Sequence, residues 1–175
     1  IDHAEYLASL ASKHEERLAS ALVTLERRIA DYVASAPLQD GQLFDLEWAI
    51  NARPEIRRLI REDYLVEIDG IIRDYREVHQ QALGMIGTYG DVIDIDSNII
   101  SQLQGLSFQG FADIGNEYLD VIAKQVYEST LTGTTFAASV AAVQQAVGGG
   151  MARYAKQQVH DSLMQFDANI NVAVG

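Results

Sequence analysis

The spacing of apolar residues predicts one long helix from about Asp2 to Ala34. One stripe of mainly apolar positions recurs every three or four residues, at Leu7, Ala11, His14, Leu18, Leu22, Leu25, Ile29 and Tyr32. This repeat places the stripe on one face of an α-helix. A helix of about 30 residues is about 45 Å long and needs a partner along its apolar face to persist in water. We therefore expect a later helix or another chain to cover the stripe.

A second helix of similar length is predicted after a polar turn. Ser35-Ala36-Pro37 ends the first helix, and Gln39-Asp40-Gly41 forms the turn. Leu43 to Ala52 is expected to be a short helical elbow, and Pro54 fits the first turn of a helix that runs to about Gly84 or Ile86. The three-or-four spacing of this helix is kept by Ile56, Ile60, Tyr64, Ile68, Ile71, Tyr75, Val78, Ala82 and Met85. The two long helices are expected to pack antiparallel as a hairpin over residues 1–90.

A boundary follows at Asp91–Asn98, where acidic and β-branched residues alternate and disfavour a helix. Ser97 or Asn98 is suited to cap a short helix from Ile99 to Gln104. From Ser107 a further helix is expected to end near Thr130, marked by Phe108, Phe111, Leu119, Ile122 and Val126.

Two glycine-containing segments divide the remainder of the chain. Thr132-Gly133-Thr134-Thr135 should close one helix and cap the next, because Gly adopts a left-handed conformation without strain and Thr accepts from free backbone N–H groups. Gly148-Gly149-Gly150 is expected to end that short helix. The buried side of the last helix is predicted to carry Met151, Ala155, Leu163, Phe166 and Ile170.

These patterns predict an all-α protein. The expected architecture is an elongated helical bundle with two long antiparallel helices plus three or more shorter helices. Residues 1–90 would form the long helical hairpin, and residues 91–175 a second helical domain.

The charge and composition of the chain limit the kinds of partner that it can bind. The chain carries 25 acidic and 13 basic residues and a formal net charge of −12, which disfavours nucleic acid as a partner. The basic run Arg57, Arg58 and Arg61 is surrounded by acidic residues, as on a solvated helix face. The alternative is contact with phosphate groups or with a partner's carboxylates. No apolar run is long enough for a membrane span, and the absence of cysteine excludes disulfides and thiolate sites.

No catalytic, cofactor-binding or metal residue is predicted. The histidines His3, His14, His79 and His160 lack the Glu-x-x-His spacing of helical di-iron sites. Asp94-Ile95-Asp96-Ser97-Asn98 begins like a calcium loop, but Ile99 and Gly105 occupy the glycine and glutamate positions of that loop. We therefore expect no enzyme activity, no cofactor and no small-molecule substrate.

The stretch from Val126 to Asp167 resembles the central helical part of the Mu F-like minor head proteins, which act in phage head morphogenesis. The resemblance rests on the Thr132-Gly133-Thr134-Thr135-Phe136 turn and on a helix of the type RYAxxxVxxSLMQFDxxxN, from Arg153 to Asn171. It covers about a third of the chain and contains no catalytic signature. The family continues into a small α/β domain, whereas this chain stops at Gly175. Since it begins at Ile1 and not Met, we expect a fragment or a processed product.

The resemblance implies a structural virion component in the phage head, at the portal or the inner capsid face. Its expected partners are the portal protein, the major capsid protein or both, and further copies of itself. The mechanism implied is docking through amphipathic helix faces. Two alternatives remain open: an internal virion protein that lines the portal tunnel and is ejected with the genome, and a cellular helical adaptor.

Overall fold

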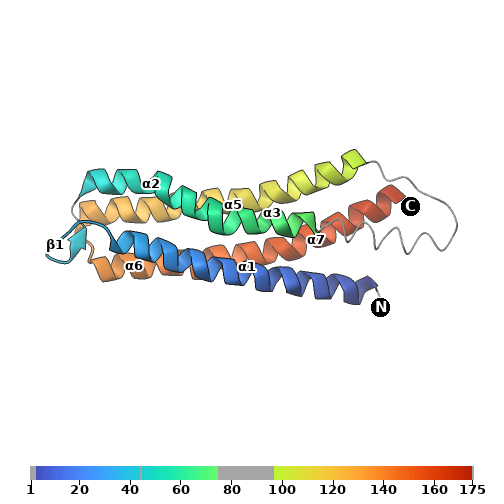
Figure 1. Ribbon diagram of the computed structural model, residues 1–175, viewed down its shortest axis with the longest axis horizontal. Coiled ribbons are helices and arrows are strands. Elements are labelled where there is room, and N and C mark those ends of the chain that lie inside the picture. The colour runs from blue at the N-terminus through green and yellow to red at the C-terminus, as the bar shows by residue number, and fades with distance from the viewer. Residues whose placement is uncertain (1–2, 44, 75–96, 175) are drawn as a thin grey trace.

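The computed structural model describes residues 3–43, 45–74 and 97–174, and these form four helical rods lying side by side (Figure 1). The first rod is α1 (His3–Ala34). The second rod is continuous through α2 (Leu46–Ile60), the π-helical turn η1 (Arg61–Leu65) and α3 (Val66–Arg73). The all-α fold class is confirmed.

The third rod is the single helix α5 (Ser97–Thr132). The fourth rod is continuous through α6 (Phe136–Gln145), the π-helical turn η3 (Ala146–Met151) and α7 (Ala152–Val174). Successive rods run antiparallel, and the bundle is elongated (Figure 1). Both α1 and α5 pack against the second and the fourth rods. The α1/α7 face and the α2/α5 face therefore lie on opposite sides of the bundle.

The apolar stripe of α1 is confirmed as core. Leu18, Leu25 and Ile29 are fully buried, and even the polar His14 is enclosed. The stripe packs against buried residues of the other three rods, among them Ile56, Tyr64, Ile68, Phe111, Ile122, Val147, Met151 and Val159. Later helices of the same chain therefore cover the stripe, which settles the alternative left open by the sequence.

Short polar turns connect the rods at one end of the bundle. After α1, β1 (Leu38–Gln39) and β2 (Gln42–Leu43) form an antiparallel ribbon. Its turn residues Asp40 and Gly41 both have positive φ, as tight hairpin turns require, so the predicted polar turn is confirmed. The predicted Gly133 turn is also confirmed, with φ of 69° at Gly133 and the Thr135 hydroxyl accepting from the Ala138 N–H. A β-bridge between Gln42 and Thr135 joins the two turns.

The prediction of an elbow helix and a new start at Pro54 was wrong. The helix begins at Leu46, because the Asp45 carboxylate accepts from the Trp48 N–H at 3.0 Å and caps it there. It then continues through Pro54, which occupies an exposed position. A proline there removes only one hydrogen bond, and water can supply a donor to the carbonyl that loses it.

The prediction of a short helix at 99–104 and a new helix from Ser107 was also wrong. Gly105 lies on the exposed side of α5 with open space around it, and the helix runs through it. Burial on the opposite side, at Ser107 and Phe111, stabilises this part of the helix. A single exposed glycine costs only about 1 kcal/mol relative to alanine, which is too little to end a well-packed helix.

The second rod and α5 meet tightly at η1. The Tyr64 hydroxyl, fully buried, donates to the Phe111 carbonyl at 2.8 Å. A Cβ on Gly115 would lie 3.4 Å from the Tyr64 ring, so the backbone of α5 lies close to this ring. Burial raises the pKa of the Tyr64 hydroxyl, which therefore stays protonated and able to donate.

Several predicted features lie outside the described residues. The predicted end of the second long helix near Gly84 or Ile86 lies there, as does His79. The predicted hairpin limit at residue 90 and the part of the boundary segment before Ser97 lie there too. The side chains of His3, Phe166 and Ile170 are not described either. Met151, Ala155 and Leu163, which share the predicted buried side of the last helix, are fully buried.

Replacing Leu18 and Leu25 together by Asp should abolish cooperative thermal unfolding, as followed by circular dichroism. Each buried leucine contributes about 1.5–3 kcal/mol of transfer free energy, and each Asp adds a buried charge. Their sum rivals the ~5–15 kcal/mol stability of a whole domain. As a control, Asp at the exposed α1 positions Ser20 and Val23 adds the same charge and should leave the melting temperature nearly unchanged. A double leucine variant that melts like the parent would show that the stripe is not core.

Candidate functional site

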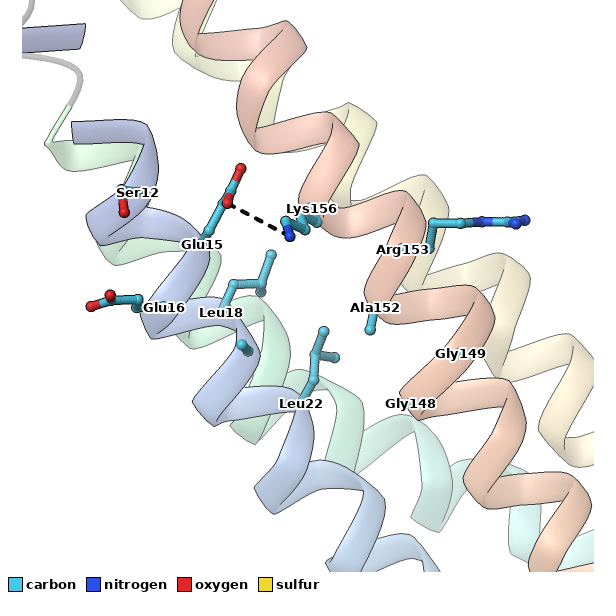
Figure 2. Close-up of a pocket in the computed structure, with 11 residues that line it drawn as sticks. Ser12, Glu15, Glu16, Leu18, Leu22, Gly148, Gly149, Ala152, Arg153 and Lys156 are labelled. Carbon is cyan, nitrogen blue, oxygen red and sulfur yellow. Dashed lines mark ion pairs between the residues drawn. The ribbon is translucent and has the colours of Figure 1, made fainter. Parts of the chain in front are cut away.

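A groove of about 470 Å³ lies between α1 and the fourth rod (Figure 2). Its floor is apolar and its lips are polar. The lining residues are Ser12, Glu15, Glu16, Leu18, Ala19, Leu22, Gly148, Gly149, Ala152, Arg153 and Lys156. The sequence predicted none of these residues as a site, because each half of the groove belongs to a different helix and is unremarkable alone.

The groove is open because its fourth-rod side carries very small residues. Gly148, Gly149 and Ala152 line it on the fourth rod (Figure 2). Ala19 is a small lining residue on α1. Side chains of ordinary size at these positions would fill the space above Leu18 and Leu22. The shape therefore suits an apolar side chain or a ridge of such side chains.

The lips of the groove carry charges of both signs. Lys156 Nζ lies 4.0 Å from Glu15 Oε2 and spans the groove (Figure 2), while His160 Nε2 lies 3.1 Å from Glu15 Oε1. The Arg153 guanidinium stacks 4.9 Å from the centre of the Tyr154 ring. Neither Arg153 nor Glu16 forms an ion pair with any residue that the structure describes. Local charge at the groove is thus near zero.

The prediction that Gly148-Gly149-Gly150 ends a helix was wrong. The three glycines lie in the π-helical turn η3, and the helix continues into α7. Buried Val147 and Met151 flank them and hold the turn against the core. A π-helical turn inside a longer helix frequently marks a functional position.

Packing within the chain explains Gly150 and leaves the other two glycines unexplained. A Cβ on Gly150 would lie 3.0 Å from Cε1 and Cζ of the Tyr118 ring, which is buried. A Cβ on Gly148 would lie 2.9 Å from a carboxylate oxygen of Glu26, but that oxygen ends a flexible side chain and can move away. A Cβ on Gly149 would meet only Gln145 Cγ, at the ordinary distance of 3.8 Å.

Gly149→Ala should therefore raise the melting temperature and Gly150→Ala should lower it. Alanine in a helix interior is favoured over glycine by about 0.5–1 kcal/mol, which corresponds to about 1–4 °C for a domain of this size. At Gly150 the clash with the Tyr118 ring outweighs that gain. Differential scanning calorimetry of the two variants measures both signs, and equal shifts would contradict the difference in packing.

Exposed apolar side chains lie on the opposite face, along α2 and α5. We define the α2/α5 patch as Leu46, Ile50, Tyr127 and Leu131, with 39, 56, 39 and 61% of each residue exposed. Ile50 and Tyr127 line the same shallow cleft. Leu46 lies four residues before Ile50 on α2, and Leu131 lies four residues after Tyr127 on α5. Each leucine is therefore one turn away on the same helix face. The sequence carried a signal for it: Leu46 and Ile50 are spaced by four, beside the core positions Ala49, Ala52 and Ile56.

An ion-pair cluster joins α1 to the end of α3. Arg17 donates to Glu67 Oε1 at 2.7 Å and to Asp74 Oδ2 at 3.0 Å. His14 Nε2 lies 3.3 Å from the same Asp74 oxygen, and Lys13 Nζ lies 3.7 Å from it. Burial lowers the pKa of His14 below its ordinary value of 6.5, against the raising effect of Asp74. His14 is thus a packed, hydrogen-bonded residue, as its place on the stripe suggested.

Acidification from about pH 7.5 to about pH 5.5 should destabilise the protein through His14. Its folded-state pKa is lowered, so below pH 6.5 the unfolded chain binds a proton that the folded chain does not. The free energy of unfolding therefore falls as the pH drops through 6.5. Urea titrations at both pH values measure the change. The variant His14→Leu should lose less stability over the same interval, and an equal loss would rule out His14 as its source.

Arg58, one of the three arginines of the predicted basic run, is paired locally. Arg58 donates to Glu55 and, at 2.8 Å, to Glu62, while Arg57 and Arg61 are exposed. Arg28 of α1 also donates to Glu62, at 2.9 Å. These contacts favour the solvated helix face over a phosphate contact.

In the described part of the chain, no group of three His, Asp or Glu side chains is placed to hold a metal ion. The loop with Asp94 and Asp96 lies outside the described residues. Among the described helices, none is both long and apolar enough to cross a membrane.

Comparison with known proteins gave no match: no family model, no curated protein and no solved structure matches this chain. The roles of the groove and of the α2/α5 patch therefore have to be inferred from their residues and shape.

Proposed function

We propose that this chain is a structural component of a tailed-phage virion: a minor head protein at the portal or the inner capsid face. In this proposal it acts in head assembly by helix-mediated docking on the portal protein, the major capsid protein or both. The proposal is supported by the resemblance of residues 126–167 to Mu F-like minor head proteins. It is also supported by two partly apolar surfaces on opposite faces of the bundle.

The proposal rests mainly on α7, the helix that carries the resemblance. Some residues of its motif are buried in the core and others are exposed. Ala155, Val159 and Leu163 are fully buried, so packing of the bundle accounts for them. Arg153 and Tyr154 belong to the same motif and are exposed, with Arg153 on a lip of the groove. The Tyr154 ring lies 6.4 Å from the Tyr118 ring, so packing accounts for part of Tyr154, whereas the exposed Arg153 guanidinium contacts the Tyr154 side chain and not the core. Such pairs are enriched where protein surfaces meet.

The charge of the chain favours protein partners with basic faces. At a net charge of −12, the long-range field attracts basic surfaces and repels nucleic acid. The apolar surfaces would supply the contact energy, because their surroundings are locally neutral. The acidic remainder of the protein would favour partners of positive charge. Packaged DNA fits this field poorly.

Two alternatives share the same surfaces. An internal virion protein that lines the portal tunnel would also dock through helices, but it would leave the particle with the genome. A cellular helical adaptor would bind non-viral partners through the groove and the α2/α5 patch. The exposed Arg153 and Tyr154 favour the minor head protein, because they belong to the motif that carries the resemblance.

The test is to follow the protein in purified phage particles by quantitative mass spectrometry, before and after DNA release. A minor head protein is present in full particles and stays in the emptied ones. An ejected protein is present before release and lost after it. Absence from particles of any kind would contradict both virion roles and favour the adaptor.

The double variant Arg153→Glu/Tyr154→Ser should lower incorporation into particles about tenfold, the effect of losing roughly 1.4 kcal/mol of contact energy. The control variant Gln144→Glu/Gln157→Ser changes two exposed residues of the same rod and should be incorporated normally. Equal incorporation of the two variants, with unchanged melting, would remove the motif from the docking surface.

A further inference from the structure

Two glycines that line the groove between α1 and the fourth rod are not required by packing within the described chain. A Cβ on Gly149 would meet only Gln145 Cγ, at 3.8 Å, and a Cβ on Gly148 would meet only the carboxyl end of Glu26. Each glycine costs about 0.5–1 kcal/mol relative to alanine in a helix interior. Glycine is the usual residue where another molecule approaches a backbone closely. The groove side of η3 is therefore suited to a close contact from outside.

We infer that the groove binds an amphipathic α-helix of another protein. The apolar side chains of this helix lie on the groove floor, and its basic side chains lie along the flank that faces α1. The inference rests on the proposed function and deepens it, because it names the chemical character of the element through which a partner docks.

The dimensions of the groove fit a short stretch of helix. On α1 the lining runs from Ser12 to Leu22, about ten steps of about 1.5 Å each, or about 15 Å in all. About three helical turns have this length, since each turn rises about 5.4 Å. Such a stretch presents apolar side chains at positions i, i+3 or i+4, and i+7, the spacing by which amphipathic helices dock into grooves.

A helix fits the floor of the groove better than an extended segment does. Both sides of the groove belong to helices, which use their backbone N–H and C=O groups internally. An extended segment above the buried Leu18 and Leu22 would find no backbone partners on the side that faces them. A helix pairs its own backbone groups and presents only side chains. The small residues Ala19 and Ala152, together with the glycines, let its axis come close.

The charges beside the groove are distributed unevenly between its two sides. Lys156 of α7 reaches across to α1 (Figure 2), with its Nζ 4.0 Å from Glu15 Oε2. On the α1 side, Glu16 and Glu26 form no ion pair with any residue that the structure describes. Glu16 points outward (Figure 2), and the Glu26 carboxylate lies against Gly148. A helix with its side chains is about 10–12 Å wide, so one flank would overhang α1 and meet these two carboxylates.

The partner helix is therefore expected to carry lysine or arginine along the flank that faces α1. The net charge of −12 acts in the same direction at long range, because it attracts a basic partner. It also disfavours a second copy of this chain as the occupant, since two molecules of this charge repel each other. Arg153 lies on the α7 side, so the other flank of the partner helix should be neutral or acidic.

A synthetic helical peptide tests the inference in an NMR titration of the isotope-labelled full chain. The peptide is about 18 residues long, so that it is helical in isolation. It carries leucines spaced three and four apart, lysines along one flank, and alanine and glutamine elsewhere. It should bind with a Kd of about 100 μM or tighter. The largest signal shifts should be those of the Gly148, Gly149 and Ala152 amides. A peptide with glutamate at every lysine position should bind about tenfold more weakly or worse.

Variants that fill the groove should lose binding. Gly149→Leu fills it from the fourth rod and Ala19→Leu fills it from α1, and each should weaken the lysine peptide about tenfold or more. Gly105→Leu is the matched control, because it adds the same side chain to α5 at a glycine with open space around it. This control should bind the peptide like the wild type. Circular dichroism confirms that each variant is folded, and the two groove variants change different helices.

A pair of charge variants separates a local contact from a general effect of net charge. Glu16→Gln/Glu26→Gln removes the two carboxylates beside the groove and should weaken the lysine peptide about threefold or more. The control Asp113→Gln/Glu117→Gln removes the same charge from exposed positions of α5 and should change the affinity less.

Several results would overturn the inference. One is the absence of any saturable shift of the groove signals at about 1 mM lysine peptide. Another is equal binding of the peptide to the wild type and to the folded groove variants, or equal binding of the lysine and glutamate peptides. A third is a sedimentation-equilibrium mass that rises with concentration in the wild type but not in the groove variants, because a second copy would then be the occupant. The presence of the protein in phage particles is measured separately, so the proposed function can stand when this inference fails.

Discussion

A helix of 32 residues with an apolar stripe along its length persists in water only if other helices cover that stripe. The antiparallel order of the four rods satisfies this requirement within one chain, because the second and fourth rods both pack on α1. Leu18, Leu25 and Ile29 reach complete burial in that way. The other features follow: short turns at one end, a shared core, and two outer faces that remain for contacts with other molecules.

The two π-helical turns adjust the rods where they meet. At η1, Tyr64 turns into the core and donates to the Phe111 carbonyl of α5. At η3, glycines let Tyr118 approach the fourth rod and leave the groove open beside α1. In a regular α-helix, residues three or four apart stay on the same face. A π-helical turn changes this spacing, so the residues that follow it point in a different direction around the helix. The site and the core thus depend on the same local irregularities.

Periodicity was sufficient to predict the fold class, the α1 stripe and the turns at Asp40-Gly41 and Gly133, because each depends on local spacing or on backbone conformation. It failed at Pro54, Gly105 and Gly148–Gly150, where residues that usually end helices lie inside them. In those places tertiary packing outweighs a local cost of about 1 kcal/mol per glycine and about 3 kcal/mol for proline. The groove was not predictable at all, since it exists only when α1 and α7 lie side by side.

A chain whose own helices cover the stripe is free to use its outer faces for docking, so docking by those faces depends on this internal coverage. Native-state hydrogen exchange measures it most directly, because the α1 amides from Leu18 to Ile29 are protected only while the stripe is covered. These amides are expected to exchange through global unfolding alone, at the same rate in dilute and concentrated protein. Protection that appears only as the protein concentration rises would contradict it, because another chain would then be covering the stripe.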